Sequence, residues 1–172
     1  MTLKKFAKPW RLHVIVEYTK TRESAYSPQR ANPSDAGLDV FYSAMDQQEI
    51  IAVHPSQSVL VPTGLRFGVP HGYMLEVKNR SSVAAKLNLV VGACVIDSGY
   101  DGEVFINVHN IGRETRVIQD GDKIAQLVMI PVVHFQPQEN IMGTLYEYPK
   151  TISNRGTGAL GSTDVQKKKK AR

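Results

Sequence analysis

The sequence predicts an all-β protein: a jelly roll or distorted barrel of short antiparallel strands, followed by an extended C-terminal arm. Apolar and polar residues alternate over residues 73–78 and 104–109, which is typical of strands with one buried face. Turn residues separate such segments at spacings that suit a sandwich or barrel. These turns are Pro62-Thr63-Gly64, Pro70-His71-Gly72, Asp101-Gly102, Ile111-Gly112 and Asp120-Gly121.

The predicted elements follow one another with short connections. Residues 11–17 are rich in β-branched side chains and predict a first strand. Residues 82–86 are the one helical candidate and are too short to change the fold class. Residues 124–133 form an apolar run interrupted by Gln126 and Pro131, so we expect a second sheet or a neighbouring subunit to cover both faces of this strand.

Length and composition favour one folded domain with a C-terminal extension. A chain of 172 residues is long enough for one core and short for two. We therefore predict a β-barrel domain over residues 1–139. The later sequence is polar and bears Gly and Pro without a second core, which predicts an arm over residues 140–164 and a basic, disordered tail over residues 165–172.

The net charge of +5 comes from that tail. Lys167 to Lys170 and Arg172 carry five positive charges and no other residue from Val165 onward is charged, so residues 1–164 carry no net charge. The tail has no aromatic side chains that could stack on bases. We expect at most a weak, salt-sensitive contact of the tail with nucleic acid or protein.

The sequence supports neither a membrane span nor a secretory signal, so we expect neither. It has no run of 18 or more apolar residues, and no apolar segment follows the charged N-terminus. Cys94 is the single cysteine and is expected to lie in the core, which agrees with a reducing compartment. The expected location is the cytoplasm.

The segment from Gly92 to Glu103 holds a candidate general base beside an aromatic ring. An apolar strand leads to Asp97, the chain turns over Ser98-Gly99, and Tyr100 follows. A carboxylate that deprotonates water must be ionised and lie within about 3 Å of that water. Asp and Gly are also ordinary turn residues, so the segment alone is consistent with a hairpin in which Asp97 caps a turn.

Arg80-Ser81-Ser82 has the composition of a phosphate-binding segment. A guanidinium pairs bidentately with phosphate oxygens, and two hydroxyls and the amides of a starting helical turn add further donors. The same three residues also occur by chance in surface loops, so the motif carries weight only together with others.

Five segments of the chain occur in the order found in trimeric dUTPases. They are Asp35-Ala36-Gly37-Leu38-Asp39, Asn79-Arg80-Ser81-Ser82, the segment from Gly92 to Glu103, Gly121-Asp122-Lys123-Ile124-Ala125-Gln126-Leu127, and Arg155-Gly156-Thr157-Gly158-Ala159-Leu160-Gly161-Ser162-Thr163. The chain resembles that family over residues 12–163. The resemblance implies a jelly roll, a homotrimer, and hydrolysis of dUTP to dUMP and pyrophosphate by attack of water on the α-phosphate.

The resemblance also implies roles for single residues. Asp97 is the general base and meets the 3'-hydroxyl of the sugar, and Ser81 and Gln126 complete the catalytic set. Arg80, Ser81 and Ser82 hold the phosphates, with Ser81 near the bridge between the α and β groups. Tyr100 stacks under the deoxyribose and excludes a 2'-hydroxyl. Main-chain groups of residues 91–96 read the uracil, which assigns Val91, Gly92, Val95 and Ile96 to the site.

Two assignments stay open. Asp39 contacts metal-bound water, or it is a structural carboxylate that pairs with Arg80. Gln126 contacts phosphate through water, or its amide makes a hydrogen bond at the edge of the core, because a buried amide needs partners.

The glycine-rich segment of the arm is the fifth motif. By resemblance Arg155 takes the γ-phosphate, and Leu160, Gly161, Ser162 and Thr163 close over the substrate. Here the chain departs from the family, because Ala159-Leu160-Gly161 stands where Gly-Phe-Gly is common. Leucine covers a base by apolar contact but cannot stack on it as a ring.

The expected cofactor is Mg²⁺ held mainly by the substrate phosphates and by water. The five histidines are scattered, Cys94 is alone, and no spacing matches a zinc site. No dedicated set of protein ligands is expected.

Two rival functions were weighed. A dCTP deaminase of the same fold places a glutamate on the strand after the aspartate, whereas this chain has Asn107 there, and Glu103 is out of phase by four residues. A dUTPase-like binding protein would contact a regulatory partner through the arm and the basic tail, and this role is compatible with catalysis.

Overall fold

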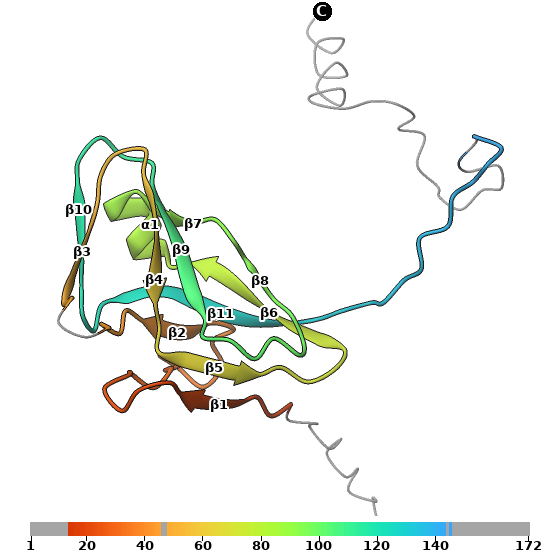
Figure 1. The fold of residues 1–172 in the computed structure, drawn as a ribbon, viewed down its shortest axis with the longest axis horizontal. Helices are drawn as coiled ribbons and strands as arrows, with labels where there is room; N and C mark the ends of the chain where they lie inside the picture. Colours follow the sequence, from red (N-terminus) through yellow and green to blue (C-terminus); the bar gives the residue numbers. More distant parts are fainter. Residues whose placement is uncertain (1–13, 46–47, 144, 146–172) are drawn as a thin grey trace, which may run out of the picture. The chain divides into compact units, whose positions relative to one another are not determined.

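The computed structural model describes residues 14–45, 48–143 and 145 of the chain, and Figure 1 shows their arrangement. This part holds eleven strands and one short helix. The elements are β1 (Glu17–Lys20), β2 (Leu38–Phe41), β3 (Ile50–Val53), β4 (Ser58–Pro62), β5 (Leu65–Gly68), β6 (Tyr73–Asn79), α1 (Ser81–Leu87), β7 (Leu89–Val91), β8 (Val95–Ile96), β9 (Phe105–Asn110), β10 (Arg116–Gln119) and β11 (Lys123–Pro131).

The strands form four antiparallel sheets. The largest has the order β2-β11-β6-β8, a second has the order β4-β9-β7, and β1-β5 and β3-β10 form two-stranded ribbons. The all-β prediction and the jelly-roll fold are therefore confirmed. Among the described residues the sheets do not close into a barrel, so the barrel form of the prediction is not observed.

The predicted alternation places the core between the sheets. Leu75 and Val77 of β6 are buried, as are Ile106 and Val108 of β9, while Phe105 at the start of β9 is exposed. Each such aliphatic side chain contributes roughly 1.5 to 3 kcal/mol when it is fully buried. The core also holds the fully buried Leu65 of β5.

The first strand lies later than the sequence predicted. β1 spans Glu17–Lys20, residues 14–16 form no strand, and residues 11–13 lie outside the described residues. The reason is the partner strand: β5 is four residues long, and its last residue, Gly68, lies opposite Glu17. Upstream residues have β propensity but no strand to pair with, and propensity alone does not decide a strand.

β11 is the central strand of the largest sheet, between β2 and β6. Ile124, Ala125 and Leu127 are buried, as expected for an apolar run. Coverage ends towards the C-terminal half, where Met129 is half-buried and Val133 is 84% exposed. Within this single chain, both faces of the apolar run at residues 124–133 are covered over its first half, as predicted, but not over its second half.

The helix prediction is confirmed, whereas the prediction for the cysteine is wrong. α1 ends at Asn88, whose φ of 54° is left-handed and whose amide donates to the carbonyl of Val83. Cys94 is half-buried and is not part of the core. Its Sγ donates to the carbonyl of Gly92 at 2.9 Å. The regular strand here covers just Val95–Ile96, so Cys94 lies outside it.

The chain divides into two compact units, Met1–His134 and Phe135–Arg172. In the second unit, a turn at residues 140–143 is closed by the Gly143 amide, which donates to the Asn140 carbonyl at 3.1 Å. The boundaries at residues 139 and 164 stay predictions. No described helix is long and apolar enough to cross a membrane.

Candidate active site

Three of the five motif segments meet in one hollow of about 330 Å³. Its lining residues come from the loop before β2, from β2, from the start of α1 and from β11. They are Ala31, Asp35, Ala36, Gly37, Asp39, Arg80, Ser81, Ser82 and Gln126. Antiparallel pairing explains the meeting, because Asp39 of β2 lies opposite Gln126 of β11, and Gln126 lies opposite Lys78 of β6, shortly before Arg80.

Asp39 pairs with two cations at the edge of this hollow. The Arg80 Nε donates to Asp39 Oδ1 at 2.9 Å, and the Lys123 Nζ lies 3.1 Å from Asp39 Oδ2. The Asp39 side chain is 11% exposed, so water screens these pairs poorly. Arg80 is further held by the carbonyl of Lys123, which accepts from Nη1 at 3.3 Å. Of the two roles left open for Asp39, the pairing with Arg80 is present.

Gln126 is half-buried and packs against a glycine. Its Nε2 donates to the carbonyl of Asn79 at 2.8 Å. A Cβ on Gly37 would lie 1.8 Å from the Gln126 Oε1, so residue 37 has no room for a side chain while Gln126 keeps this position. The amide therefore has the hydrogen bond that its partial burial requires, and it also lines the hollow.

Asp97 and Tyr100 lie in a separate hollow of about 200 Å³ whose remaining lining is apolar. The amide of Tyr100 donates to the Asp97 carbonyl at 3.2 Å, and Gly99 in between has a φ of 90°, which favours glycine. Asp97 is exposed, and its carboxylate has no hydrogen-bond partner among the described residues. Val95 and Ile96 also line this hollow.

Val91 and Gly92 are not among the lining residues of the Asp97 hollow. The Val91 amide donates to Asn79 Oδ1 at 2.8 Å, and the Gly92 amide donates to the Asn107 carbonyl at 2.9 Å. These two donors are therefore already engaged within the chain.

The two hollows share no lining residue. The Arg80 guanidinium bonds Asp39 on β2, whereas Asp97 follows β8, and these strands are opposite edges of one sheet. Three strand spacings separate the edges, or about 14 Å. Asp97 also continues β8 away from Arg80, because Ile96 lies opposite Leu75 and Val95 opposite Glu76. One copy of the chain thus keeps the two groups apart.

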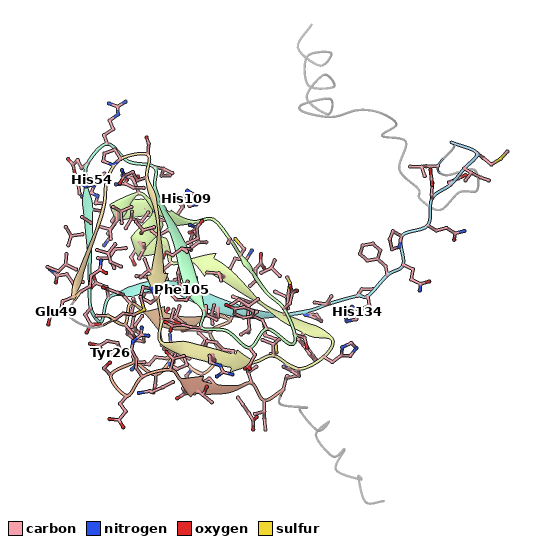
Figure 2. All side chains as sticks on the ribbon, in the orientation of Figure 1. Tyr26, Glu49, His54, Phe105, His109 and His134 are labelled. Carbon is pink, nitrogen blue, oxygen red and sulfur yellow. The ribbon has the colours of Figure 1, made fainter. Side chains whose placement is uncertain are left out.

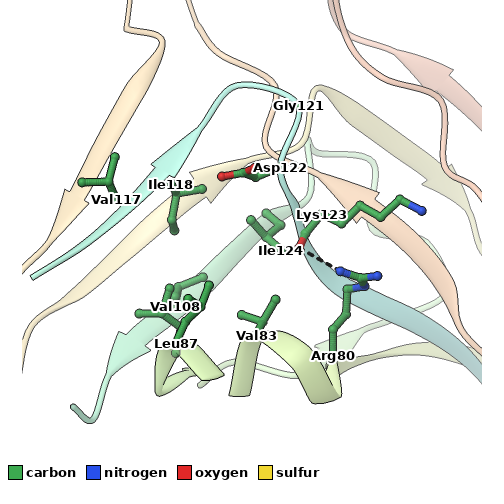
Figure 3. A pocket seen from close by; sticks show the side chains of 11 residues that line it. Arg80, Val83, Leu87, Val108, Val117, Ile118, Gly121, Asp122, Lys123 and Ile124 are labelled. Atoms are coloured by element: carbon green, nitrogen blue, oxygen red, sulfur yellow. Dashed lines mark hydrogen bonds between the residues drawn. The ribbon is translucent and has the colours of Figure 1, made fainter. Parts of the chain in front are cut away.

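A third hollow, of about 420 Å³, lies between α1 and residues of β9, β10 and β11 and is mostly apolar (Figure 3). Val83 and Leu87 of α1 face Ile118 and Ile124 across it. Arg80 lines this hollow as well as the first one, so one residue borders both. α1 has no buried residue, which makes it a lightly packed support for Arg80 and the serines that follow.

A protein-family model described as dUTPase matches residues 23–158. The chain belongs to the dUTPase family. The deoxyuridine 5'-triphosphate nucleotidohydrolase of Desulfitobacterium hafniense (strain DSM 10664 / DCB-2) is 38% identical to it over 157 residues, which cover 90% of this chain and 97% of that protein. The enzyme of the same name from Anaplasma marginale (strain St. Maries) is 36% identical over 138 residues, which cover 79% of this chain and 87% of that protein.

Solved structures of phage dUTPases have the same fold. A mutant of the dUTPase from phage phi11 of S. aureus aligns with a TM-score of 0.67 and 25% identity, covering 74% of this chain and 97% of that one, and coordination of a structural Mg(II) ion is described for it. A mutant dUTPase of Staphylococcus bacteriophage 80alpha, solved with dUpNHpp, aligns with a TM-score of 0.70 and 24% identity, covering 87% of this chain and 98% of that one.

The fifth motif is the one motif that the described residues do not include. Arg155, Leu160, Gly161, Ser162 and Thr163 lie outside the described residues. Their assignment to the site stays a prediction.

Three charged residues that hold residues of the site in place were not predicted from the sequence to do so. Lys123 pairs with Asp39, and Glu103 pairs with Arg22 behind the Asp97 turn. Lys123 lies inside the fourth motif and could have been noticed there. The Glu103 pair joins residues 81 positions apart, and no local pattern indicates it.

The histidines do not form a metal site in the described part of the chain, where no three His, Cys, Asp or Glu side chains gather. His54 and His109 lie towards one end of the sheets and His134 towards the other (Figure 2). His71 stacks on His134 with ring centroids 4.9 Å apart.

Two tyrosines outside both hollows have a raised pKa. A hydrogen bond to Asp120, followed by burial, raises the pKa of Tyr26. Burial, followed by the charge of Asp120, raises the pKa of Tyr42. Both hydroxyls therefore remain protonated donors at neutral pH, and Tyr26 donates to Asp120 Oδ2 at 2.7 Å.

Proposed function

We propose that the chain hydrolyses dUTP to dUMP and pyrophosphate by attack of water on the α-phosphate, with Asp97 as the general base. Family membership supports the reaction. The contrast between the two aspartates supports the choice of base: Asp39 is tied to two cations, whereas the carboxylate of Asp97 is exposed and unpaired among the described residues. A base needs free lone pairs facing water.

The hollow around Arg80 is the proposed phosphate site. Arg80 and Lys123 carry two positive charges here, and Asp39 and Asp35 carry two negative ones, so the anion contact would come from the Arg80 guanidinium that lines the hollow rather than from a net positive charge. Ser81 and Ser82 offer exposed hydroxyls at the same rim, with Ser81 assigned to the α–β bridge. Gln126 would contact phosphate through water from the opposite wall.

The hollow beside Asp97 is the proposed site of the nucleoside. Its apolar lining suits a planar base and the carbon face of a sugar. Tyr100 would lie under the deoxyribose and occupy the space that a 2'-hydroxyl needs. Main-chain groups of residues 91–96 would read the uracil, with Val95 and Ile96 closest among the assigned residues because they line this hollow.

Mg²⁺ is the proposed cofactor and would arrive on the triphosphate. The groups around Arg80 fit a hydrated ion carried by its substrate: Ser81, Ser82 and Gln126 offer neutral oxygens. The carboxylate of Asp39 is paired with two cations, and that of Asp35 accepts hydrogen bonds from Asn32. Mg²⁺ keeps much of its hydration and prefers phosphate oxygens. When bound, it would neutralise phosphate charge.

A homotrimer is the proposed assembly, because a single chain separates the base from the phosphate site. A general base must lie within about 3 Å of the attacking water, and the edges that hold Asp97 and Asp39 are about 14 Å apart before the offset along the strands is added. A neighbouring copy could bring its own Asp97 hollow to the Arg80 hollow of the first. Cytoplasmic location and contact of the basic tail with nucleic acid or protein remain proposals from the sequence.

The direct test is pyrophosphate release from dUTP, compared with dCTP, dTTP and UTP, with Mg²⁺ present or chelated. We expect release from dUTP in Mg²⁺ and a large loss on chelation. Deamination of dCTP without pyrophosphate release from dUTP would overturn the proposal. The structure gives no support to deamination, because Asn107 is an amide bonded to His109 at 2.6 Å and Glu103 is engaged by Arg22.

A further inference from the structure

The carboxylate of Glu103, which follows the Asp97 turn in the chain, accepts hydrogen bonds from three different residues. Oε2 accepts from Thr21 Oγ1 at 3.0 Å and from Arg22 Nη1 at 3.1 Å, and Oε1 accepts from the Gly64 amide at 2.8 Å. The side chains of Glu103 and Arg22 are 14% and 20% exposed. Arg22 also donates to the carbonyl of Ser43, so it is fixed from a second side. Hydrogen bonds that involve ionised groups are the strong ones, and here they converge on one carboxylate.

The main chain of the same residue holds Tyr100. The Tyr100 hydroxyl donates to the Glu103 carbonyl at 2.9 Å. The ring folds back over Gly102, where an added Cβ would lie 2.4 Å from the hydroxyl oxygen and 2.6 Å from Cζ. The ring therefore lies over Gly102, which has no side chain, and the next residue, Glu103, is held in place by the hydrogen bonds of its carboxylate.

We propose that Glu103, Arg22 and Gly102 are positioning residues that set the discrimination between dUTP and UTP by fixing the ring of Tyr100. The inference rests on the proposed function, in which Tyr100 closes the space of the 2'-hydroxyl. None of the three residues lines the Asp97 hollow, so they act through Tyr100.

The physical reason is rigidity. A single hydroxyl is a small difference, and a wall that yields by about 1 Å no longer excludes it. Tyr100 is 48% exposed, so packing alone does not fix its ring. The bond to the Glu103 carbonyl and the absence of a side chain at Gly102 supply the missing constraint.

The experiment compares kcat/KM for dUTP and for UTP in Glu103→Gln. The amide would turn an N–H towards the donors of Thr21 or Arg22, which loosens these hydrogen bonds at nearly constant volume. We expect the UTP to dUTP ratio of kcat/KM to rise about tenfold, the order expected for a small steric difference. Asp101→Asn is the matched control: it makes the same charge change in the same turn, at an 86% exposed side chain that pairs with Arg66, and it should leave the ratio unchanged.

Two further variants keep the test decisive if Glu103→Gln fails to fold. Gly102→Ala displaces the ring and Tyr100→Phe removes the hydroxyl, and both leave the Glu103 carboxylate intact; each should raise the ratio. Tyr100→Ala is the reference for a fully removed wall.

If Tyr100→Ala raises the ratio while Glu103→Gln and Gly102→Ala do not, the positioning role is overturned and the proposed function stands. If Tyr100→Ala leaves the ratio unchanged, the role of Tyr100 falls, and this inference with it. If the unsubstituted chain shows no hydrolysis of dUTP, the proposed function itself has failed.

Discussion

At the scale of single residues, two aspartates of the motifs differ by environment alone. Asp39 lies at the buried edge of a sheet with a cation on each oxygen, whereas Asp97 lies on an exposed turn and is unpaired among the described residues. The ion pairs of Asp39 use the lone pairs that a base would need, and they orient Arg80. Surroundings rather than residue type therefore favour Asp39 as a support for Arg80 and Asp97 as the proposed base.

We expect Asp97→Asn to keep the fold and the binding of dUTP but to lower kcat at least about a hundredfold, the usual scale for loss of a general base. Single-turnover pyrophosphate release and nucleotide titration measure the two effects separately. Asp101→Asn, four residues later on the same turn, should keep kcat close to that of the unsubstituted chain. An unchanged kcat in Asp97→Asn would return Asp97 to the role of a turn residue.

Asp39→Asn should destabilise the fold, because Arg80 and Lys123 would lose their shared carboxylate. We expect the free energy of unfolding to fall by about 1 to 3 kcal/mol. Urea denaturation measures this change. Glu114→Gln is the control, because the Glu114 side chain is 74% exposed where it pairs with Arg116. Breaking this pair should cost at most about 0.5 kcal/mol. Equal losses in both variants would mean that burial adds nothing to the Asp39 pairs.

The sequence predicts residues whose chemistry is local and misses those whose role depends on distant partners. Arg80, Ser81 and Gln126 were predicted from short motifs, and the structure brings them together in one hollow. The pair of Glu103 with Arg22 could not be predicted, because it forms only after the chain between them has folded. Cys94 was expected in the core because it lies in an apolar segment read as a strand, but the strand that forms there, β8, covers just Val95–Ile96.

At the scale of elements, the alternation of apolar and polar residues predicted the strands that have one buried face. It failed where the bounds of a strand depend on the length of the strand it pairs with. β6 and β9 follow the predicted pattern. β1 does not, because its length is set by β5. The separation of the sheets, which do not close into a barrel, is likewise a matter of pairing that side-chain patterns do not encode.

The contact between Gly37 and Gln126 gives a prediction about how the approach to β2 packs on β11. Gly37→Ala should push the Gln126 amide away from Asn79 and raise KM for dUTP several-fold, because a Cβ would lie 1.8 Å from Oε1. Gly68→Ala is the control, since a Cβ there would meet its nearest atom at 3.7 Å. Steady-state kinetics of both variants decide, and an equal effect of the two would contradict a specific role for the Gly37 contact.

The arm gives a prediction that rests on the sequence motif, because residues 146–172 lie outside the described residues. Deleting residues 154–172 should leave a folded core with most of its turnover gone, since Arg155 and the residues after it are assigned to the γ-phosphate and to cover of the base. Leu160→Phe in the full chain should tighten binding by about 0.5 to 1.5 kcal/mol if a ring over the uracil is favourable. Full turnover in the truncated chain would remove the arm from the site.

At the scale of the whole molecule, the order of the motifs indicates the family and its reaction. It does not indicate whether the motifs meet within one chain. The sheet decides this point. The guanidinium of Arg80 bonds Asp39 on the edge strand β2, whereas Asp97 follows β8 at the other edge, and their hollows have no residue in common. The proposed homotrimer would bring the two hollows of neighbouring copies together, and a closed ring is the ordinary way to repeat one contact.

Subunit complementation tests this conclusion. Asp97→Asn and Arg80→Gln should each be nearly inactive alone, with a mass of three times the 19.1 kDa chain in solution. If the base and the phosphate site come from different subunits, an equal mixture exchanged through denaturant should regain about a quarter of full activity, because one neighbouring pair in four then joins an intact Asp97 to an intact Arg80. Arg80→Gln mixed with Ser81→Ala is the control: both changes lie in one hollow, so exchange rebuilds no site and activity should stay at the mean of the two variants. If the first mixture also stays at the mean of its parents, Asp97 and Arg80 act within the same chain, and the chain would have to rearrange to bring them together.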